Sequence, residues 1–554
     1  MSPASQTPRP ATAWLSLAAL ALLAVAAALW LWQPRDPAPP AVAATPLRTT
    51  DTDLTKVSAA IDAALEADWS SRGIHGLPPV DDLIVARRLS LALTGAIPSL
   101  EEIRLLESQP AEDRLDFWLD RLLADPRSAD YLAERLARAS VGVEGGPFLV
   151  YRRLALVRWL SEQLQQRRPY DAIVREMITA EGLWTTNPAA NFITSSIDNN
   201  NQKEGPDQIR LAIRTTRAFL GVRIDCVQCH DDKFGDRWKQ QDFHQLAAFY
   251  AGAEMKMTGV RDDRHKPHEV RFRGDAEERT VLPAVPFLPH LLPDQGRPRE
   301  QLAVWATHPE NLPFARATAN RMWAILFGRP LVEPIDDIPL DAADVPPALE
   351  VLARDFAQQG HDLHRLIATI AGTRAFRRDS RSPDPAQPAT AEQEKAWAAF
   401  PLTRLRPEQV AGGVIQATQL STIDRQSPFL IQLARFGQTT DFVKRYGDPG
   451  ESEFEDPGGT IPQRLLMMNG KLVRERADKN PLFGAVSRIR ALAPDPAAAV
   501  EVAYLCLFTR RPTETERSHF AGRLTEAARP EARQRVLEDL YWSLLNSTEF
   551  SWNH

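Results

Sequence analysis

Two cysteines and a histidine stand in the spacing C-x-x-C-H near the middle of the chain, as Cys226, Cys229 and His230. Positions i, i+3 and i+4 of a helical turn share one face, so the two thiols and the imidazole could act on one bound group. This spacing serves in c-type haem attachment, where the thiols form thioethers to the haem vinyl groups and the imidazole binds the iron. The segment therefore predicts covalent haem c on Cys226 and Cys229, with His230 as the proximal iron ligand.

The same cluster permits three other interpretations. The cysteines could hold zinc tetrahedrally with a further ligand from His230, His244 or Asp232. The second C-x-x-C of a four-cysteine site is absent, however. They could form a dithiol redox pair, although the surrounding pattern does not predict the βαβ context of such motifs. They could also form a structural disulfide between neighbours on a helix.

A sixth ligand for the haem iron is marked less clearly than the fifth. Met255 and Met257 follow the helix predicted after the motif, and methionine opposite histidine would raise the reduction potential. A second histidine would lower it, and the candidates are His244, His265 and His268. An open sixth position, suited to ligand binding or peroxidase-like chemistry, is a further alternative.

The N-terminal region contains an uncharged apolar run, AWLSLAALALLAVAAALWLW, at residues 13–32. About 20 residues span a bilayer core as a helix, whereas the apolar core of a cleaved signal peptide usually has about 7–15. Trp14 lies at one end and Trp30 and Trp32 at the other, as expected for rings at the two headgroup regions. We expect a transmembrane signal-anchor that is retained, with a cleaved signal as the alternative.

The charges around this run do not decide its orientation, because Arg9 precedes it and Arg35 and Arg48 follow it. Haem is attached to C-x-x-C-H outside the cytoplasm, so the haem interpretation places the large domain in the periplasm or an equivalent extracytoplasmic compartment. The prediction is a single-pass inner-membrane protein, held in the membrane by its N-terminal helix, with residues 1–12 in the cytoplasm.

Composition bounds the remaining possibilities. The 554 residues exceed one compact core, and the hydrophobic share of 44% is that of an ordinary globular protein. A net charge of −6 argues against nucleic acid as a partner. Only 3 cysteines exclude a disulfide framework. No Ser-His-Asp, nucleotide-phosphate or glycosidase arrangement can be singled out, so the pattern leaves open whether the chain is an enzyme.

Hydrophobic spacing predicts a mainly α-helical protein behind the membrane span. Val57, Ile61 and Leu65 recur at helical spacing, and similar runs continue along the chain. Clustered prolines and short β-prone runs after residue 256 predict a connector with a short hairpin. The predicted order is a Pro-rich linker at 33–52, a cytochrome-c-like helical domain at 53–256, the connector at 257–297 and a second helical domain at 298–554.

Local signals predict several helix ends. Ser99 followed by Glu102 is typical of a capping box that opens a helix. Pro169 predicts the start of a new helix after a break. Gly328 is a plausible C-cap for the helix predicted at 311–328.

The second domain contains polar residues that could be functional: Arg316, Asn320, Arg321, Asp336 and Asp337. We interpret them as a buried Arg–Asp network that ties the helix at 311–328 to the segment EPIDDI, without chemistry. Cys506 stands in the apolar segment VAYLCLF and is predicted to be a buried core thiol.

Several motifs in order resemble a known family. CVQCHDDKFGDRWKQQDFHQLAAFY is similar to CAQCHDHKFDP…DYYxLAAFF of secreted planctomycete proteins with cytochrome-c-like naming. RRLSLALTGAIPSLEEI and LDRLLADPRSADYLAERLAR resemble further motifs of the same proteins. HPENLPFARATANRMWAILFGRPLVEPIDDI, TIPQRLLMMNG and YWSLLNSTEF resemble motifs of their second domain. The resemblance covers the chain from about residue 57 to the C-terminus.

The resemblance implies two paired domains of unknown function. Where that family shows histidine, this chain has Asp232, a poor ligand for haem iron. We expect a membrane-tethered periplasmic c-type haem protein that exchanges electrons with an unidentified redox or enzyme partner. The alternatives are an extracytoplasmic scaffold or binding protein with a structural metal or disulfide at the cluster, and an accessory protein in polysaccharide breakdown.

Overall fold

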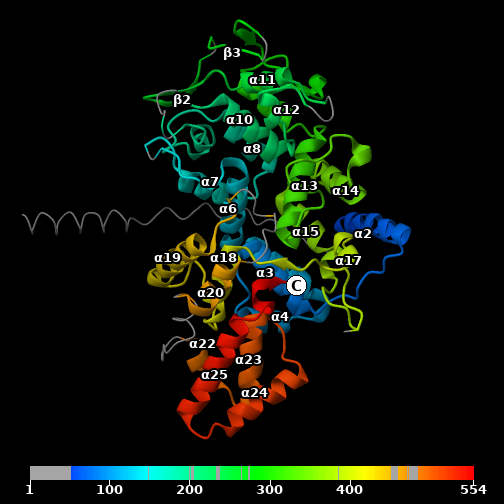
Figure 1. Ribbon diagram of the computed structural model, residues 1–554, viewed down its shortest axis with the longest axis vertical. Helices are drawn as coiled ribbons and strands as arrows, with labels where there is room; N and C mark the ends of the chain where they lie inside the picture. Colours follow the sequence, from blue (N-terminus) through cyan, green and yellow to red (C-terminus); the bar gives the residue numbers. More distant parts are fainter. Residues whose placement is uncertain are drawn as a thin grey trace, which may run out of the picture. The chain divides into compact units, whose positions relative to one another are not determined.

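The computed structural model describes residues 52–147, 149–198, 200, 205–232, 237–263, 265–272, 275–384, 386–450, 454, 460–470, 472 and 484–554. In these residues the protein is mainly helical, with three small two-stranded antiparallel sheets (Figure 1). The predicted mainly α fold class is thereby confirmed. The predicted cytoplasmic segment at 1–12, the span at 13–32 and all of the linker at 33–52 except Thr52 lie outside the described residues.

The expectation of a transmembrane helix is not met in the part of the chain that the structure describes. None of the helices there is long and apolar enough to cross a bilayer. The one segment from which that helix was predicted, 13–32, is not among those residues.

The first part of the chain is a set of helices joined by short loops. Their bounds are α2 Thr52–Arg72, α3 Asp82–Thr94, α4 Leu100–Glu107, α5 Arg114–Ala124, α6 Pro126–Val141, α7 Arg153–Gln165, α8 Tyr170–Thr179 and α9 Asn191–Thr194. α6 packs along α7, and α3 packs against both α5 and α6. Large apolar side chains such as Trp118 and Leu119 are fully buried between them, as the helical spacing of the sequence requires.

The local signals for helix ends are confirmed. Ser99 caps α4 in a capping box, in which its hydroxyl accepts from the Glu102 N–H and the Glu102 carboxylate accepts from the Ser99 N–H. α8 begins directly after Pro169. Gly328 ends α13 (Leu312–Phe327) with φ 82°, a left-handed conformation that glycine adopts without a Cβ penalty.

The second part of the chain shares the hydrophobic core of the first. Its helices are α12 Pro298–Ala306, α13, α14 Pro347–Gln358, α15 Leu363–Ala371, α16 Arg374–Arg377 and α17 Ala391–Lys395. α2, the first described helix, packs on α14 and α15 (Figure 1). The Ser58 hydroxyl donates to the Thr369 carbonyl at 2.9 Å, and the Asp62 carboxylate accepts from the Arg374 N–H at 2.9 Å. Residues more than 300 positions apart therefore close one core.

The C-terminal helices build a second core against the opposite side of α3. They are α18 Pro407–Ala417, α19 Phe429–Tyr446, α20 Ile461–Asn469, α22 Ala485–Leu492, α23 Pro496–Phe508, α24 Glu514–Glu526 and α25 Pro530–Leu545, with β5 Thr403–Arg404 paired to β6 Trp552–Asn553. Leu91 on α3 belongs to this second core, whereas Leu89 and Leu93 belong to the first. The Arg88 guanidinium donates to the His554 carbonyl at 2.8 Å, so the chain end lies beside α3 (Figure 1). Cys506 on α23 is a buried free thiol, as predicted.

The cysteine segment lies between α10 (Gln208–Thr215) and α11 (Gln240–Ala248). α10 continues into a π-helical turn, η4 (Thr216–Leu220), and then the short 3-10 turn η5 (Asp225–Gln228). Two antiparallel hairpins follow α11, made of β1 Ala253–Lys256 with β2 Gly259–Asp262, and of β3 His268–Val270 with β4 Arg279–Val281. The region predicted as a connector with a short hairpin thus holds one whole hairpin, and the other begins before it.

Gly221 closes η4 and lies close to the second part of the chain. Its φ is 63°, and a Cβ there would stand 2.9 Å from Ile338 Cδ1 and 3.1 Å from the Ala317 Cβ. The Ile338 N–H donates to the Gly221 carbonyl at 2.8 Å. Both the left-handed backbone and the close approach of the second part of the chain therefore require glycine at this position.

Gly221→Ala is expected to lower the free energy of unfolding by about 2–4 kcal/mol, because it adds a steric clash to a left-handed backbone. Gly73→Ala is the matched control, since Gly73 has φ 64° and nothing within 4 Å of a Cβ. Gly73→Ala should lower the free energy of unfolding by about 1 kcal/mol, the cost of a left-handed backbone at alanine. Guanidinium denaturation followed by circular dichroism measures both, and equal losses would contradict the packing argument.

Candidate functional site

Cys226 and Cys229 lie in a short surface segment between α10 and α11. Cys226 belongs to η5 (Asp225–Gln228), and Cys229 directly follows it. Both side chains are exposed free thiols. Where a helical turn was expected, the chain forms a single 3-10 turn that ends just before Cys229.

Buried contacts on the inner side hold this turn in place. Val227, between the two cysteines, is fully buried in the main core. The Gln228 carbonyl accepts from the Gln240 side-chain amide at 3.0 Å and from His244 Nε2 at 3.2 Å, both on α11. The Asp232 N–H donates to the Trp238 carbonyl at 2.9 Å.

His244 and His268 form the inner support of the turn. His244 Nδ1 lies 3.2 Å from His268 Nε2, and His268 Nδ1 lies 2.8 Å from the Gln208 side-chain nitrogen. Because the Gln228 carbonyl can only accept, His244 must donate from Nε2 and accept at Nδ1. His268 must then donate from Nε2 and accept at Nδ1 from the amide of Gln208. A single chain of hydrogen bonds, from the Gln208 amide through His268 and His244 to the Gln228 carbonyl, therefore pairs every ring nitrogen of two neutral imidazoles.

Burial keeps both rings neutral at pH 7. His244 is 5% exposed and His268 is 3% exposed. Burial lowers the pKa of His268 to about 4, and the adjacent His244 lowers it further in the same direction. Burial also lowers the pKa of His244, against the opposing effect of its bond to the Gln228 carbonyl. A proton on His244 Nδ1 would face the N–H of His268, so the geometry and the electrostatics agree.

His230 is arranged as a ligand would be. Its Nδ1 lies 2.8 Å from the carbonyl oxygen of Asp231, which can only accept, so Nδ1 carries the proton. The other ring nitrogen, Nε2, then holds the lone pair. A backbone carbonyl on the remote ring nitrogen is the usual way in which proteins orient a metal-binding imidazole.

The prediction of a metal-binding cluster of protein side chains is wrong for the residues that the structure describes. Among them, no three or more histidine, cysteine, aspartate and glutamate side chains are grouped so that they could hold a metal ion. The alternative of zinc on the two cysteines with His230, His244 or Asp232 is therefore dropped. A physical reason is clear for His244, because both of its ring nitrogens are already in hydrogen bonds.

The candidates for a sixth iron ligand lie on the hairpins. Met255 is a half-buried residue of β1, opposite Val260. Met257 lies in the turn between β1 and β2 with its side chain 97% exposed. His265 is exposed, and its N–H donates to the Asp263 carboxylate at 2.9 Å. Of the histidines considered for this role, His244 and His268 are used in the hydrogen-bonded pair.

A network of charges connects the cysteine turn to the second part of the chain. Asp225, directly before Cys226, has a carboxylate oxygen 3.4 Å from the Arg217 guanidinium. Arg217 and Arg223 both reach Asp336, at 2.6 Å each. These two arginines lower the pKa of Asp336 against the opposing effect of its burial. The two oxygens of one carboxylate thus each pair with a different arginine.

The predicted Arg–Asp network around the helix at 311–328 exists only in part. Arg316 pairs with Glu350 at 2.8 Å and donates to the Leu340 carbonyl. Asn320 provides the link to EPIDDI, because its amide donates to the carbonyls of Val332 and Ile335. The partners of Asp336, Arg217 and Arg223, come from the first part of the chain. Sequence reasoning missed them, and the only signal was the position of Arg223 three residues before Cys226.

Comparisons with known proteins find two families. Residues 60–255 match a family model described as "PSCyt2: Protein of unknown function (DUF1549)". Residues 298–445 match one described as "PSD1: Protein of unknown function (DUF1553)". No curated protein and no solved structure matches the chain. The expected pair of domains of unknown function is confirmed, and the cysteine turn lies in the first of them.

Asp336→Asn is expected to lower the free energy of unfolding by about 1–3 kcal/mol, because two arginines lose their shared carboxylate and only partly regain water. Asp337→Asn is the matched control, since Asp337 is the exposed neighbour, and its effect should stay within about 0.5 kcal/mol. Chemical denaturation measures both variants. If they proved equally stable, Asp336 would not hold the two parts together.

The free energy of unfolding is expected to fall as the pH is lowered, and part of this fall depends on His268. The pKa of His268 is 6.5 in its ordinary state and about 4 in the folded protein. At a pH between these two values, His268 is protonated in the unfolded chain and neutral in the folded protein. This contribution is fully present above pH 6.5 and is lost as the pH falls. From pH 7 to 5 the wild type should lose about 1–2 kcal/mol more than His268→Gln.

Urea denaturation at the two pH values measures this difference. His290→Gln, at an exposed histidine outside the pair, should keep the wild-type pH dependence. A His268→Gln protein with the same pH dependence as the wild type would show that the pair does not hold a neutral imidazole.

Proposed function

We propose that the protein is a c-type haem protein that transfers single electrons, with covalent attachment at Cys226 and Cys229. The observation that carries the proposal is the hydrogen bond from His230 Nδ1 to the Asp231 carbonyl at 2.8 Å, directly after the exposed free thiols of Cys226 and Cys229 in sequence. It directs the lone pair of Nε2 to a metal, as a proximal ligand needs. Haem iron takes four ligands from the porphyrin, so it needs no cluster of three protein ligands.

The residues of the turn fit the chemical needs of haem c. Two exposed thiols three residues apart would supply the sulfurs for two thioether bonds, and His230 would supply the axial nitrogen. A haem held there supplies one-electron redox chemistry whose potential depends on its axial ligands and surroundings. The exposure of Cys226 and Cys229 would place the attachment edge at the surface, where a partner protein can approach.

The support beneath the turn favours a site that holds its shape. Val227 is anchored in the core, and the Gln228 carbonyl is fixed by Gln240 and His244. Preorganised ligands cost less ordering when a group binds. Attachment of haem to C-x-x-C-H takes place outside the cytoplasm, so the proposal includes an extracytoplasmic location for this domain.

The full chain, produced in a host with c-haem maturation, is expected to show a Soret band and a haem stain that survives denaturing electrophoresis. The double variant Cys226→Ala, Cys229→Ala should lose the stain, because no sulfur remains for a thioether. Cys506→Ala is the matched control and should keep it, since that thiol is buried in the second core.

Two results would contradict the proposal. One is a folded wild-type protein without covalent haem under these conditions. The other is a double-cysteine variant that still carries the stain. Circular dichroism of each variant checks that a lost stain does not come from a failure to fold.

A further inference from the structure

A cavity of the described residues lies apart from the two thiols, between the two family regions. It has a volume of about 960 Å³ and lies among α10, η4, α13, β5 and the end of α19. Ligand sites for small molecules usually fall between about 300 and 1,000 Å³. The volume is therefore that of a site for an organic molecule rather than for a single ion.

The lining of this cavity contains more arginines than carboxylates. Seven arginines line it, and the carboxylates that do so are four, Glu333, Asp336, Glu394 and Asp448. Burial raises the pKa of Glu394, against the opposing effect of Arg329. The protein has a net charge of −6, so this local excess of positive charge runs against the whole molecule. A cleft with one sign of charge concentrates ligands of the opposite sign.

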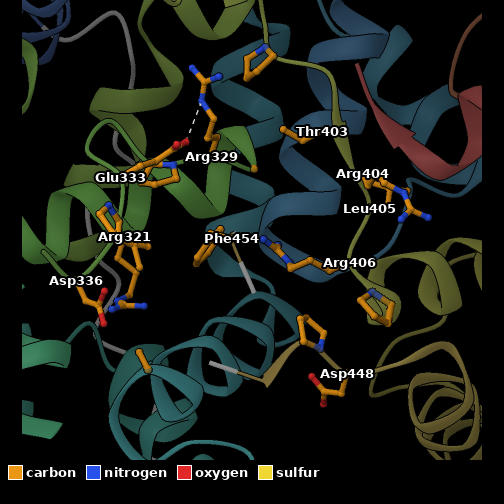
Figure 2. Close-up of a pocket in the computed structure, with 18 of the residues that line it drawn as sticks. Arg321, Arg329, Glu333, Asp336, Thr403, Arg404, Leu405, Arg406, Asp448 and Phe454 are labelled. Carbon is orange, nitrogen blue, oxygen red and sulfur yellow. Dashed lines mark ion pairs between the residues drawn. The ribbon is translucent and has the colours of Figure 1, made fainter. Parts of the chain in front are cut away.

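Most of these arginines already have partners, as Figure 2 shows for Arg329, which pairs with Glu333 at 3.5 Å. Arg217 and Arg223 share Asp336. Arg406 reaches Glu408 at 3.2 Å. These groups fix the shape of the cavity, and their charges are largely balanced by neighbouring carboxylates.

Arg321 is the exception that indicates a ligand. It comes from α13, its side chain lines the cavity, and it is only 8% exposed. Among the described residues it has neither a hydrogen-bond acceptor nor an ion-pair partner. An anion in the cavity would supply acceptors for the N–H donors of the Arg321 guanidinium.

Arg404 offers a second cation from a different element. It lies on β5, and its bonds go to neutral oxygens, those of Gln463 at 3.4 Å and of the Tyr446 hydroxyl at 3.3 Å. No carboxylate among the described residues pairs with it. Figure 2 shows Arg321 and Arg404 on opposite sides of the view, with Phe454 and Arg406 between them. Two cations on different elements suit two separate anionic groups on one ligand.

We propose that this cavity binds an organic anion with at least two carboxylate, phosphate or sulfate groups, one held by Arg321 and one by Arg404. Guanidinium forms paired hydrogen bonds with each of these groups, and such charge-assisted bonds are the strong ones. The prolines, Tyr446 and Phe454 in the lining supply apolar surface for the carbon skeleton. The proposal concerns a site separate from the cysteine turn and does not depend on haem.

Isothermal titration of the full chain with citrate and with inorganic pyrophosphate tests the site, with glucose as the neutral control. Binding of either anion, weakened by added salt, is the expected result. Arg321→Gln and Arg404→Gln should each raise the Kd at least about tenfold, because each removes a charge-assisted bond. Arg517→Gln is the matched control, an exposed arginine that pairs within α24 and should bind like the wild type.

Thermal unfolding separates a binding role from a structural one. Without a ligand, Arg321→Gln should melt no lower than the wild type, since Arg321 has no described partner to lose. With citrate or pyrophosphate, the wild type should gain stability and the variant should not. The proposal is overturned if neither anion binds at about 10 mM, if both variants bind like the wild type, or if Arg321→Gln melts clearly lower without ligand.

Discussion

The carboxylate of Asp336 accepts from Arg217 and Arg223 at 2.6 Å each, and through Arg217 it reaches Asp225, the residue before Cys226. Beside it, the Ile338 N–H bonds to the carbonyl of Gly221, where there is no room for a Cβ. These contacts join the two family regions at the point where the chain enters the cysteine turn. The position of the turn and one wall of the arginine cavity therefore depend on the same few charged groups.

The cysteine turn combines a rigid base with an exposed outer side. Val227 and the neutral pair of His244 and His268 fix it from within by burial and by one directed chain of hydrogen bonds. The two thiols are exposed, and the described hydrogen bond of the His230 ring uses Nδ1 and not Nε2. The buried hydrogen bonds can orient the cysteine turn because none of them involves the groups proposed to bind haem.

The arginine cavity differs from the cysteine turn in how its polar groups are paired. Most of its cations are neutralised and stabilise the fold, whereas Arg321 is buried without an acceptor among the described residues. A cation that lines a cavity and has no carboxylate partner among the described residues is free to pair with an anionic ligand. The two sites are thus recognised in different ways. The cysteine turn is recognised by residue types and spacing, and the arginine cavity by a charge without a described partner.

The sequence by itself determined the mainly helical fold, the helix ends at Ser99, Pro169 and Gly328, the buried Cys506 and the C-x-x-C-H pattern, because these depend on local spacing and backbone preference. It could not identify the partners of Asp336 or the support of His244 by His268 and Gln208. Those contacts join residues between 24 and 119 positions apart, and any of the chain's many arginines and acids could have paired. Only the tertiary structure decided them, together with the isolation of Arg321, because burial and the absence of an acceptor are properties of packing and not of spacing.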